Sequence, residues 1–314
     1  MDMLFVMDPL KAINVKKDTT FAFMMEAQRR GHGLWVCETR DLSATPARGY
    51  ALASRVEVRA VEGDHFTVIE SARRDLESFP TVWMRKDPPF DMAFLYATFL
   101  LEQVDPSKCL VINRPRGLRD ANEKAYILNF GQFTPDTLVT RSRDEILRFV
   151  AEVGGKAVIK PLDQMGGTGI FLLREDDANL NSIIETSTHF GEETIMVQRY
   201  VPEAAQGDKR IVLMDGEPLG AILRVPSGKE FRGNMAAGGR AQSATITERE
   251  REIIDAVVPR LREDGIWFVG LDVLGDYLTE VNVTSPTGVQ EINRLDGVAC
   301  ETVVIDWAEA NAPG

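Results

Sequence analysis

Short apolar runs alternate with amphipathic segments along the first third of the chain, and this pattern predicts a sheet with helices packed on it. The candidate strands are residues 4–7, 34–38, 82–85 and 110–113. Residues 20–30 carry apolar side chains at helical spacing and are followed by Gly31, as in an amphipathic helix that ends at a glycine. A second helical stretch covers residues 91–102. Because strands alternate with helices, we expect a mostly parallel sheet.

The rest of the chain has a different pattern, in which strands follow one another through tight turns. Candidate strands are residues 157–160, 195–200, 210–214, 219–224, 266–274 and 277–283. Helices are expected from about Asn122, through Ile183 and over residues 248–262. We therefore expect an α/β domain followed by an α+β region with antiparallel hairpins. The predicted domains are residues 1–121, residues 122–200 and residues 201–314, the last with a lid loop over residues 226–240.

Length, net charge and cysteine content limit which binding partners and which cellular compartment are expected. The chain has 314 residues, enough for two or three domains, and a net charge of −12. An acidic protein repels nucleic acid and anionic membranes on average, so neither is an expected partner. No apolar run is long enough to span a bilayer, and the first residues lack the basic segment of a signal peptide. Three widely spaced cysteines suit a reducing compartment, so we expect a cytoplasmic protein.

A glycine-rich turn follows the strand that ends at Lys160. Gly166 and Gly167 allow the backbone to bend closely around phosphate, with N–H groups directed at its oxygens. A buried lysine beside such a turn needs an anion. The turn lacks the Gly-Lys-Ser/Thr ending of a Walker A motif, and a plain turn between strands is the alternative.

A predicted hairpin near the C-terminus carries three oxygen donors. A three-residue turn over residues 275–277 would pair Asp272 with Glu280 and leave Asn282 on the same face, whereas a two-residue turn would send Glu280 to the other face. We expect the three-residue turn. Two carboxylates and one amide oxygen are ligands suited to Mg²⁺, although an exposed polar sheet face would look similar.

Cationic side chains gather in the same half of the chain, although each one singly would be an ordinary surface charge. Lysines supply point charges, and arginines grip phosphate or carboxylate through two bonds. Two arginines lie in the glycine-rich loop over residues 226–240, which is typical of a mobile lid. Arg85 and Lys86 end a strand before a proline pair, where either a ligand or a rigid turn is expected. The cations are Lys124, Lys160, Lys209, Arg210, Arg224, Arg232 and Arg240.

Nine stretches along nearly the whole chain are MDPL, INVKKDTTFAFMMEAQRRG, MRKDPPFD, LRDANEKAY, TPDTLVTR, KPLDQMGG, GDKRIVLMDGEP, RGNMAAGGR and FVGLDVLGDYLTEVNVTSPTG. Together they resemble the bacterial glutathione synthetase family of ATP-grasp enzymes. The resemblance implies an ATP-grasp fold with an N-terminal parallel-sheet, Rossmann-like domain. It also implies a ligase that joins γ-glutamylcysteine to glycine using ATP, and a homo-oligomer, which in this family is a tetramer.

The resemblance also implies roles for residues at matching positions. The implied ATP-binding residues are Lys124, Lys160, Gly166, Gly167, Gln198, Tyr200, Val201 and Asp208. The implied catalytic residues are Arg210, Arg224 and Arg232. Two Mg²⁺ ions, with Mn²⁺ as a possible substitute, would be held by Asp272, Glu280 and Asn282. The implied peptide-binding residues are Arg232, Arg240, Ser285, Pro286 and Thr287.

The chain departs from the family pattern at Gln164, at Thr168 and over residues 288–293. We expect these departures to leave the ATP chemistry intact. The mechanism implied is transfer of the γ-phosphoryl group to a carboxylate, followed by attack of an amine. Two alternatives are another ATP-grasp ligase that adds amino acids to a peptide or protein, and a non-catalytic nucleotide-binding protein. The three histidines lie outside every motif and are given no role.

Overall fold

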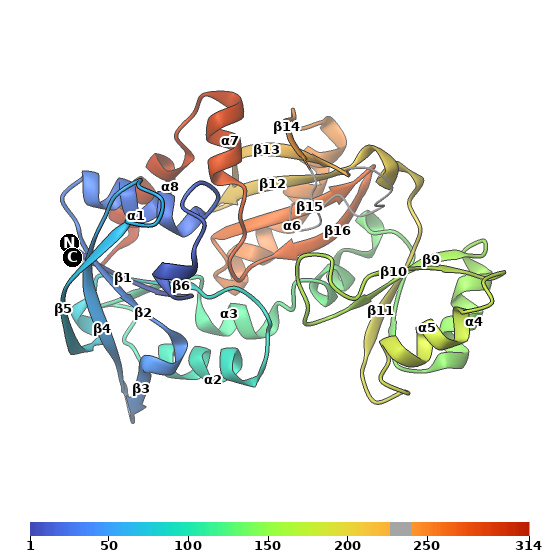
Figure 1. Cartoon of the computed structure of the whole chain (residues 1–314), viewed down its shortest axis with the longest axis horizontal. Helices are drawn as coiled ribbons and strands as arrows, with labels where there is room; N and C mark the ends of the chain where they lie inside the picture. The colour runs from blue at the N-terminus through green and yellow to red at the C-terminus, as the bar shows by residue number, and fades with distance from the viewer. Residues whose placement is uncertain (227–239, 314) are drawn as a thin grey trace.

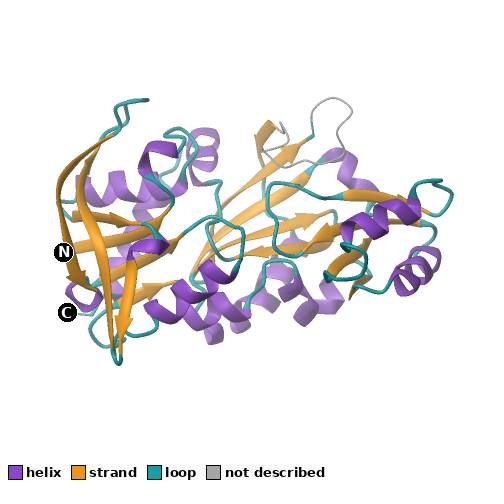
Figure 2. Ribbon diagram, turned by 60° about the horizontal axis from the view of Figure 1, so that its bottom comes forward, coloured by secondary structure: helices purple, strands orange, loops and turns teal. Residues whose placement is uncertain are grey.

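The computed structural model describes residues 1–226 and 240–313, and these form three sheets with helices around them (Figure 1). Arg232 and most of the predicted lid loop lie outside the described residues. In Figure 2 strands run through the middle of the molecule and along the end where the N-terminus lies, and helices flank them. Among the described residues, no helix is long and apolar enough to cross a membrane.

The first sheet has seven strands and is mixed. Its order is β3-β4-β2-β1-β6-β7, and β5 pairs with β4 beyond this path. The pairs β1–β2, β1–β6 and β6–β7 are parallel, while the three pairs that involve β4 are antiparallel. The expected mostly parallel sheet is therefore correct only for one half. The strands are β1 (Asp2–Met7), β2 (Gly33–Cys37), β3 (Leu42–Thr45), β4 (Arg48–Val58), β5 (Phe66–Asp75), β6 (Thr81–Arg85) and β7 (Leu110–Ile112).

Helices that pack on this sheet begin where the sequence supplies a cap. The Asp18 carboxylate accepts a hydrogen bond of 2.7 Å from the Phe21 backbone N–H at the start of α1 (Thr19–Arg29). Asp91 caps α2 (Met92–Leu101) in the same way. The α3 helix (Pro115–Asp120) begins with a proline, which costs no hydrogen bond in the first turn. Each predicted helix of this region is therefore confirmed.

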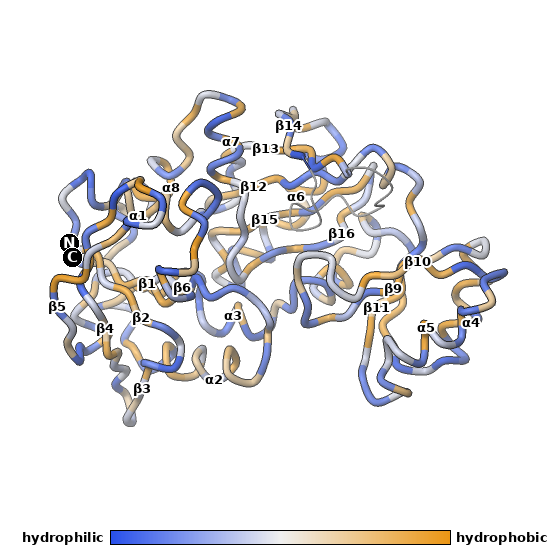
Figure 3. Tube along the Cα trace, in the orientation of Figure 1, coloured by the Kyte–Doolittle hydropathy of each residue, from blue (hydrophilic) through white to orange (hydrophobic). Residues whose placement is uncertain are grey.

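The second sheet has four antiparallel strands in the order β10-β9-β11-β8, and α4 (Arg143–Glu152) and α5 (Leu180–Ser187) pack against it. Apolar residues dominate its inner strands, as the orange colour along β9 and β11 shows (Figure 3). The helix expected from Asn122 is a 3₁₀ segment, η4 (Ala125–Phe133). The strands are β8 (Thr137–Thr140), β9 (Lys156–Pro161), β10 (Phe171–Arg174) and β11 (Ile195–Arg199).

The third sheet has five antiparallel strands in the order β14-β13-β12-β15-β16. The long helix α6 (Glu248–Asp264) packs on it, begins at a reciprocal Thr247–Glu250 cap and ends at Gly265, whose φ is 71°. The strands are β12 (Asp208–Met214), β13 (Glu217–Val225), β14 (Arg240–Ser243), β15 (Phe268–Leu274) and β16 (Tyr277–Asn282). Each sheet lies within one predicted domain, whose boundaries at residues 121 and 200 stay predictions.

Two C-terminal helices, α7 (Val289–Asp296) and α8 (Cys300–Asn311), return to the first domain and pack against α1. Val304 and Ile305 of α8 belong to the same buried cluster as Phe5 and Met24. Arg30, which follows α1, forms ion pairs of 2.6 Å and 2.8 Å with Asp306 and Glu309 on α8. The two ends of the chain consequently form one packed unit (Figure 1).

Candidate active site

A cavity of about 570 Å³ is lined by residues from all three sheets and from the loops that join them. Its walls contain every residue predicted for ATP, metal or peptide binding apart from Arg232 and Arg240. Arg232 lies outside the described residues, and Arg240 begins β14 with an exposed side chain. The cavity therefore brings together residues from Met7 to Glu291, which are 284 positions apart in the sequence.

The hairpin of β15 and β16 directs its acidic residues into this cavity, but its turn and register differ from those that the sequence predicted. The turn has two residues, Gly275 and Asp276, rather than the three expected. A β-bulge then shifts the register by one residue, so that Val273 pairs with Leu278 but Asp272 pairs with Glu280. Thr279 is the additional residue, and its hydroxyl donates a hydrogen bond of 3.1 Å to the Asp272 carbonyl oxygen. The predicted pairing is thus confirmed, while the predicted turn is wrong.

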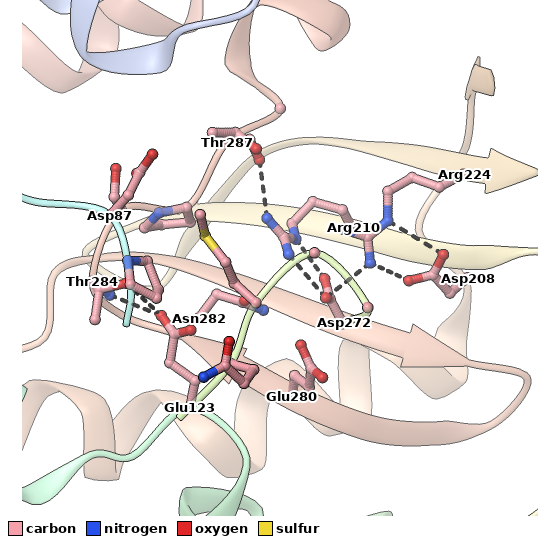
Figure 4. A pocket seen from close by; sticks show the side chains of 18 of the residues that line it. Asp87, Glu123, Asp208, Arg210, Arg224, Asp272, Glu280, Asn282, Thr284 and Thr287 are labelled. Carbon is pink, nitrogen blue, oxygen red and sulfur yellow. Dashed lines mark hydrogen bonds and ion pairs between the residues drawn. The ribbon is translucent and has the colours of Figure 1, made fainter. Parts of the chain in front are cut away.

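Asp272 is buried between two arginines of neighbouring strands (Figure 4). Arg210 on β12 donates to both carboxylate oxygens, in one case over 2.9 Å, and Arg224 on β13 lies 2.8 Å from the second oxygen. Burial alone would raise the pKa of Asp272, but the two guanidinium groups outweigh it and hold the pKa well below its usual range. Asp272 is therefore ionised, and its charge keeps both arginines in place.

Arg224 also donates to Asp208, which lines the cavity and belongs to this cluster of charges; its expected place near a ribose stays a prediction. Burial lowers the proton affinity of a guanidinium, but Asp272 and Asp208 reverse this effect and raise the pKa of Arg224. Burial raises the pKa of Asp208 in spite of Arg224, with Asp272 adding to the rise. Two arginines therefore face two carboxylates at the base of the cavity.

Glu280 and Asn282 differ from Asp272 because, among the described residues, their side-chain oxygens accept no hydrogen bond and form no ion pair. The Glu280 carboxylate makes no hydrogen bond or ion pair within the described parts of the chain, and Figure 4 draws no interaction from it. The Asn282 amide donates to the Gly270 carbonyl oxygen over 3.2 Å, which leaves its own oxygen directed elsewhere. Half-buried donors of this kind fit a hard divalent cation.

No group of three or more His, Cys, Asp or Glu side chains that could hold a metal ion is found in residues 1–226 and 240–313. The predicted metal site, Asp272, Glu280 and Asn282, does not need three such side chains, because its third donor is the amide oxygen of Asn282. An unpaired carboxylate, a free amide oxygen and the ionised Asp272 lie on one face of the hairpin. The donor chemistry therefore fits a metal that shares phosphate oxygens with the protein.

Two lysines also line the cavity. Lys160, at the end of β9, is buried and donates a hydrogen bond of 2.9 Å to the Gln198 side chain. Burial lowers the pKa of Lys160, although the attraction of Glu280 opposes this effect. Lys124 is also buried, and its ammonium donates to the Gln164 carbonyl oxygen in the glycine-rich turn over 2.5 Å. Both lysines are therefore held at the cavity surface by neutral oxygens.

The glycine-rich turn connects β9 with β10, and its glycines adopt conformations that suit the close approach of a ligand. Gly166 and Gly167 have φ values of 66° and 78°, in the left-handed region that favours glycine. Gln198, Tyr200 and Val201 follow at the end of β11, where the chain passes from the second sheet to the third. This connection was expected to be the adenine hinge, and the structure places it on the cavity wall.

A loop after β16 closes the cavity on the side of the first domain. It contains Ser285, Pro286 and Thr287, and the Thr287 carbonyl oxygen accepts a hydrogen bond of 3.2 Å from Arg210. Glu123 supports this loop, since one of its carboxylate oxygens accepts hydrogen bonds from the Val283 and Thr284 backbone N–H groups, each 3.0 Å long. Burial raises the pKa of Glu123 in spite of these bonds.

Sequence reasoning missed several groups that line the cavity, notably Glu123, Asp87 and Asp18. Arg85 ends β6, a position already noted as one where ligands bind, but nothing local showed that its side chain would be buried. The departure over residues 288–293 forms most of α7, and Gln290 donates to the Val15 and Asp18 carbonyl oxygens. None of the three histidines lines the cavity within the described residues.

Comparison with known sequences decides the family. The profile described as "Prokaryotic glutathione synthetase, N-terminal domain" matches residues 1–119, and that described as "Prokaryotic glutathione synthetase, ATP-grasp domain" matches residues 123–297. The chain belongs to the prokaryotic glutathione synthetase family. Two similar proteins named glutathione synthetase share 50% identity (Synechococcus elongatus) and 49% identity (Gloeobacter violaceus) with it. These matches cover 99% and 98% of this chain, and 98% and 96% of the relatives.

Solved structures confirm the fold of this family member. A D-cycloserine synthetase matches with a TM-score of 0.67 and 16% identity over 99% of this chain and 100% of its own. A RimK domain ATP-grasp protein from Sphaerobacter thermophilus matches with a TM-score of 0.63 and 16% identity over 98% of each chain. The predicted ATP-grasp fold is thus confirmed, and the glutathione synthetase family makes the chain an ATP-dependent ligase. Enzymes of this family are metal-dependent in general.

Proposed function

We propose that the chain joins γ-glutamylcysteine to glycine, with conversion of ATP to ADP and phosphate, to give glutathione. The observation that carries this proposal is the unpaired Glu280 carboxylate, which lies beside the ionised Asp272 in a cavity that Lys124 and Lys160 also line. Such an arrangement suits a metal–nucleotide complex and an anionic substrate. The family supplies the identity of the substrates.

Nucleotide binding is assigned to the wall between the second and third sheets. Lys124, Lys160 and the glycine-rich turn at Gly166 and Gly167 would hold the phosphates, because the lysines bring positive charge to the cavity and the two glycines line it. Gln198, Tyr200 and Val201 would contact the adenine. Asp208 would lie near the ribose, although its carboxylate is already paired with Arg224.

Asp272, Glu280 and Asn282 would hold two Mg²⁺ ions, for which Mn²⁺ could substitute. When bound, these ions would neutralise charge on the phosphate oxygens. The chain's own part is to keep Glu280 and Asn282 free for this purpose while Asp272 stays ionised between its arginines. The two carboxylates face each other across the hairpin, so the site gains stability when cations separate them.

Peptide bond formation needs an activated carboxylate, because a free carboxylate is a poor acylating agent. Its oxygen would take the γ-phosphoryl group of ATP and form an acyl phosphate with release of ADP. The neutral amine of glycine would then attack the acyl carbon and expel phosphate. Arg210, Arg224 and Arg232 would stabilise the negative charge that spreads over the transferred group.

The peptide would lie between the third sheet and the loop of Ser285, Pro286 and Thr287, with Arg232 and Arg240 approaching from the lid. Water must be excluded while the acyl phosphate exists, and a closed lid would do this. We also propose that the protein acts in the cytoplasm as a homo-oligomer, a tetramer by analogy with its family.

Incubation of the enzyme with ATP, Mg²⁺, γ-glutamylcysteine and glycine, followed by mass analysis for glutathione, tests the proposed function. We expect one phosphate for each glutathione and no reaction with D-alanine in place of both substrates. Phosphate release only with D-alanine or another peptide would support a different ATP-grasp ligase. Nucleotide binding without phosphate release from any acceptor would show a protein that binds but does not catalyse.

A further inference from the structure

Three consecutive residues between α3 and η4 contact two separate parts of the cavity lining. Asn122, Glu123 and Lys124 belong to no helix or strand and follow directly on the predicted domain boundary at residue 121. The side chains of Asn122 and Lys124 reach the second sheet, and that of Glu123 reaches the third. Residues 122–124, the connecting segment, therefore join two sheets that are otherwise far apart in the sequence.

The connecting segment holds the glycine-rich turn through two backbone carbonyls. The Asn122 side-chain amide donates a hydrogen bond of 3.0 Å to the Leu162 carbonyl oxygen. The Lys124 ammonium donates over 2.5 Å to the Gln164 carbonyl oxygen. The Asn122 side-chain oxygen accepts from the backbone N–H groups of Lys124 and Ala125, over 3.2 Å and 2.9 Å, so both ends of this amide are fixed. The turn consequently has a fixed position relative to the segment.

Glu123 holds the third sheet. Its backbone carbonyl oxygen accepts a hydrogen bond of 2.9 Å from Val281 on β16, the last strand of that sheet. One oxygen of its carboxylate accepts from the Val283 and Thr284 backbone N–H groups, each over 3.0 Å, and from the Thr284 hydroxyl over 2.8 Å (Figure 4). The loop of residues 285–287 begins directly after Thr284, so it starts from a point that Glu123 fixes.

We propose that Asn122 and Glu123 are positioning residues that set the distance between the nucleotide and the peptide. The inference rests on the proposed function, which places the ATP phosphates at the glycine-rich turn and the peptide at the loop after β16. Phosphoryl transfer needs reacting atoms roughly 3–3.5 Å apart, and a misplacement of about 1 Å can cost roughly 100-fold in rate. A short link between the two binding regions controls this distance without touching either substrate.

The proposed role depends on the acceptor oxygen of Glu123 rather than on its charge. Glutamine would present a carbonyl oxygen at the same position, so it can keep the three hydrogen bonds. Leucine has a similar size but no acceptor. Val283 and Thr284 are buried, and a buried N–H group without an acceptor is costly, so the loop after β16 should shift until its N–H groups find new partners.

The test compares Glu123→Leu with Glu123→Gln and with the control Glu57→Leu, whose glutamate is exposed on β4. Phosphate release gives kcat and the KM values for ATP, γ-glutamylcysteine and glycine. Glu123→Leu should lower kcat by roughly 10- to 100-fold while each KM stays within about threefold of the wild type, because each region still binds its own substrate. Glu123→Gln should keep kcat within about threefold, and the control should match the wild type.

Asn122→Ser tests the link to the second sheet independently. A serine oxygen can still cap the N–H groups of Lys124 and Ala125, but it is too short to reach the Leu162 carbonyl. The variant should lower kcat with unchanged KM values. The double variant Asn122→Ser/Glu123→Leu should lose less than the product of the two single losses, because either break already frees the distance. Calorimetric titration with a non-hydrolysable ATP analogue counts the binding-competent molecules, so lost protein is not read as lost kcat.

The outcomes separate this inference from the proposed function. An unchanged kcat in Glu123→Leu would overturn the positioning role, and so would a Glu123→Gln variant as slow as Glu123→Leu, since the charge would then act on a substrate directly. A fall in kcat that disappears after correction for binding-competent protein would show a merely structural residue. If Glu123→Leu does not fold, Asn122→Ser decides. A wild type that makes no glutathione would overturn the proposed function and this inference with it.

Discussion

Replacing Glu280 by Gln separates the catalytic use of the β15–β16 hairpin from its stability. The substitution keeps the shape of the side chain and removes one negative charge. Glu280 has no ion pair to lose within the described residues, and it lies opposite the ionised Asp272. Relief of this repulsion is worth about 0.2–1 kcal/mol, while the lost attraction to Lys160 opposes it. The free energy of unfolding should therefore change by less than about 1 kcal/mol.

The matched variant Asp272→Asn should behave differently. Asp272 lies between Arg210 and Arg224, and its neutralisation leaves both guanidinium groups buried with too little negative charge. Breaking a buried pair in this way costs about 3–5 kcal/mol. At about 2–4 °C per kcal/mol, the thermal midpoint should fall by about 6–20 °C, against less than about 4 °C for Glu280→Gln.

The assay pairs thermal unfolding, followed by circular dichroism, with phosphate release in the presence of ATP, Mg²⁺ and both substrates. Glu280→Gln should lose at least roughly 100-fold in kcat, the scale of a lost electrostatic stabiliser, while its unfolding midpoint is nearly unchanged. A variant that unfolds as early as Asp272→Asn would show that Glu280 is a structural ion-pair partner. Activity within about tenfold of the wild type would remove it from the metal site.

Three further predictions concern other features of the chain. Deletion of Thr279 removes the bulge but leaves a regular two-residue hairpin in which Glu280 still lies opposite Asp272, so phosphate release should be retained; its loss with an unchanged far-UV spectrum would contradict this. Because burial lowers the pKa of Lys160, its ammonium should lose its proton at a lower pH than an ordinary lysine, and ATP affinity should weaken as it does so. Isothermal titration calorimetry at rising pH measures this, and Lys160→Met should show no such pH dependence. The hydrogen bond from Arg29 lowers the pKa of Glu26 from 4.5 to about 2. Glu26 should thus add about 1–2 kcal/mol to the free energy of unfolding at pH 7, a value that already allows for the exposure of Arg29, and this contribution should be lost as the pH falls from 4.5 to about 2. Denaturation of the wild type and of Glu26→Gln at several pH values measures it. A difference in stability that persists at pH 2 would contradict the assignment.

The elements that could be predicted are those in which local pattern and tertiary environment agree. Apolar runs such as those of β1 and β6 are buried on both faces, as continuous runs should be. The antiparallel strands β4 and β5 were missed because charged residues interrupt them. β5 contains Glu70, Arg73 and Arg74, and it lies at an edge of the sheet where polar side chains reach solvent.

Site residues were predictable where they are close in sequence, and not where they depend on distant partners. Asp272 and Glu280 belong to one hairpin, and their pairing was predicted from a three-residue turn, whereas the structure reaches the same pairing through a two-residue turn and a bulge. Arg85 makes its contacts with Thr20 and Pro286, which are 65 and 201 positions away. No local signal distinguishes such a buried arginine from a surface charge.

The return of α8 to the first domain has a consequence for biosynthesis. The apolar face of α1 and the first strand share a core with Val304 and Ile305, which are synthesised only after the second and third sheets. The N-terminal unit therefore cannot complete its packing until α8 has been synthesised, and part of its apolar surface stays uncovered until then. A stop codon before residue 300 would leave a nascent protein whose first domain is a substrate for chaperones and proteases, although every residue of that domain had been made.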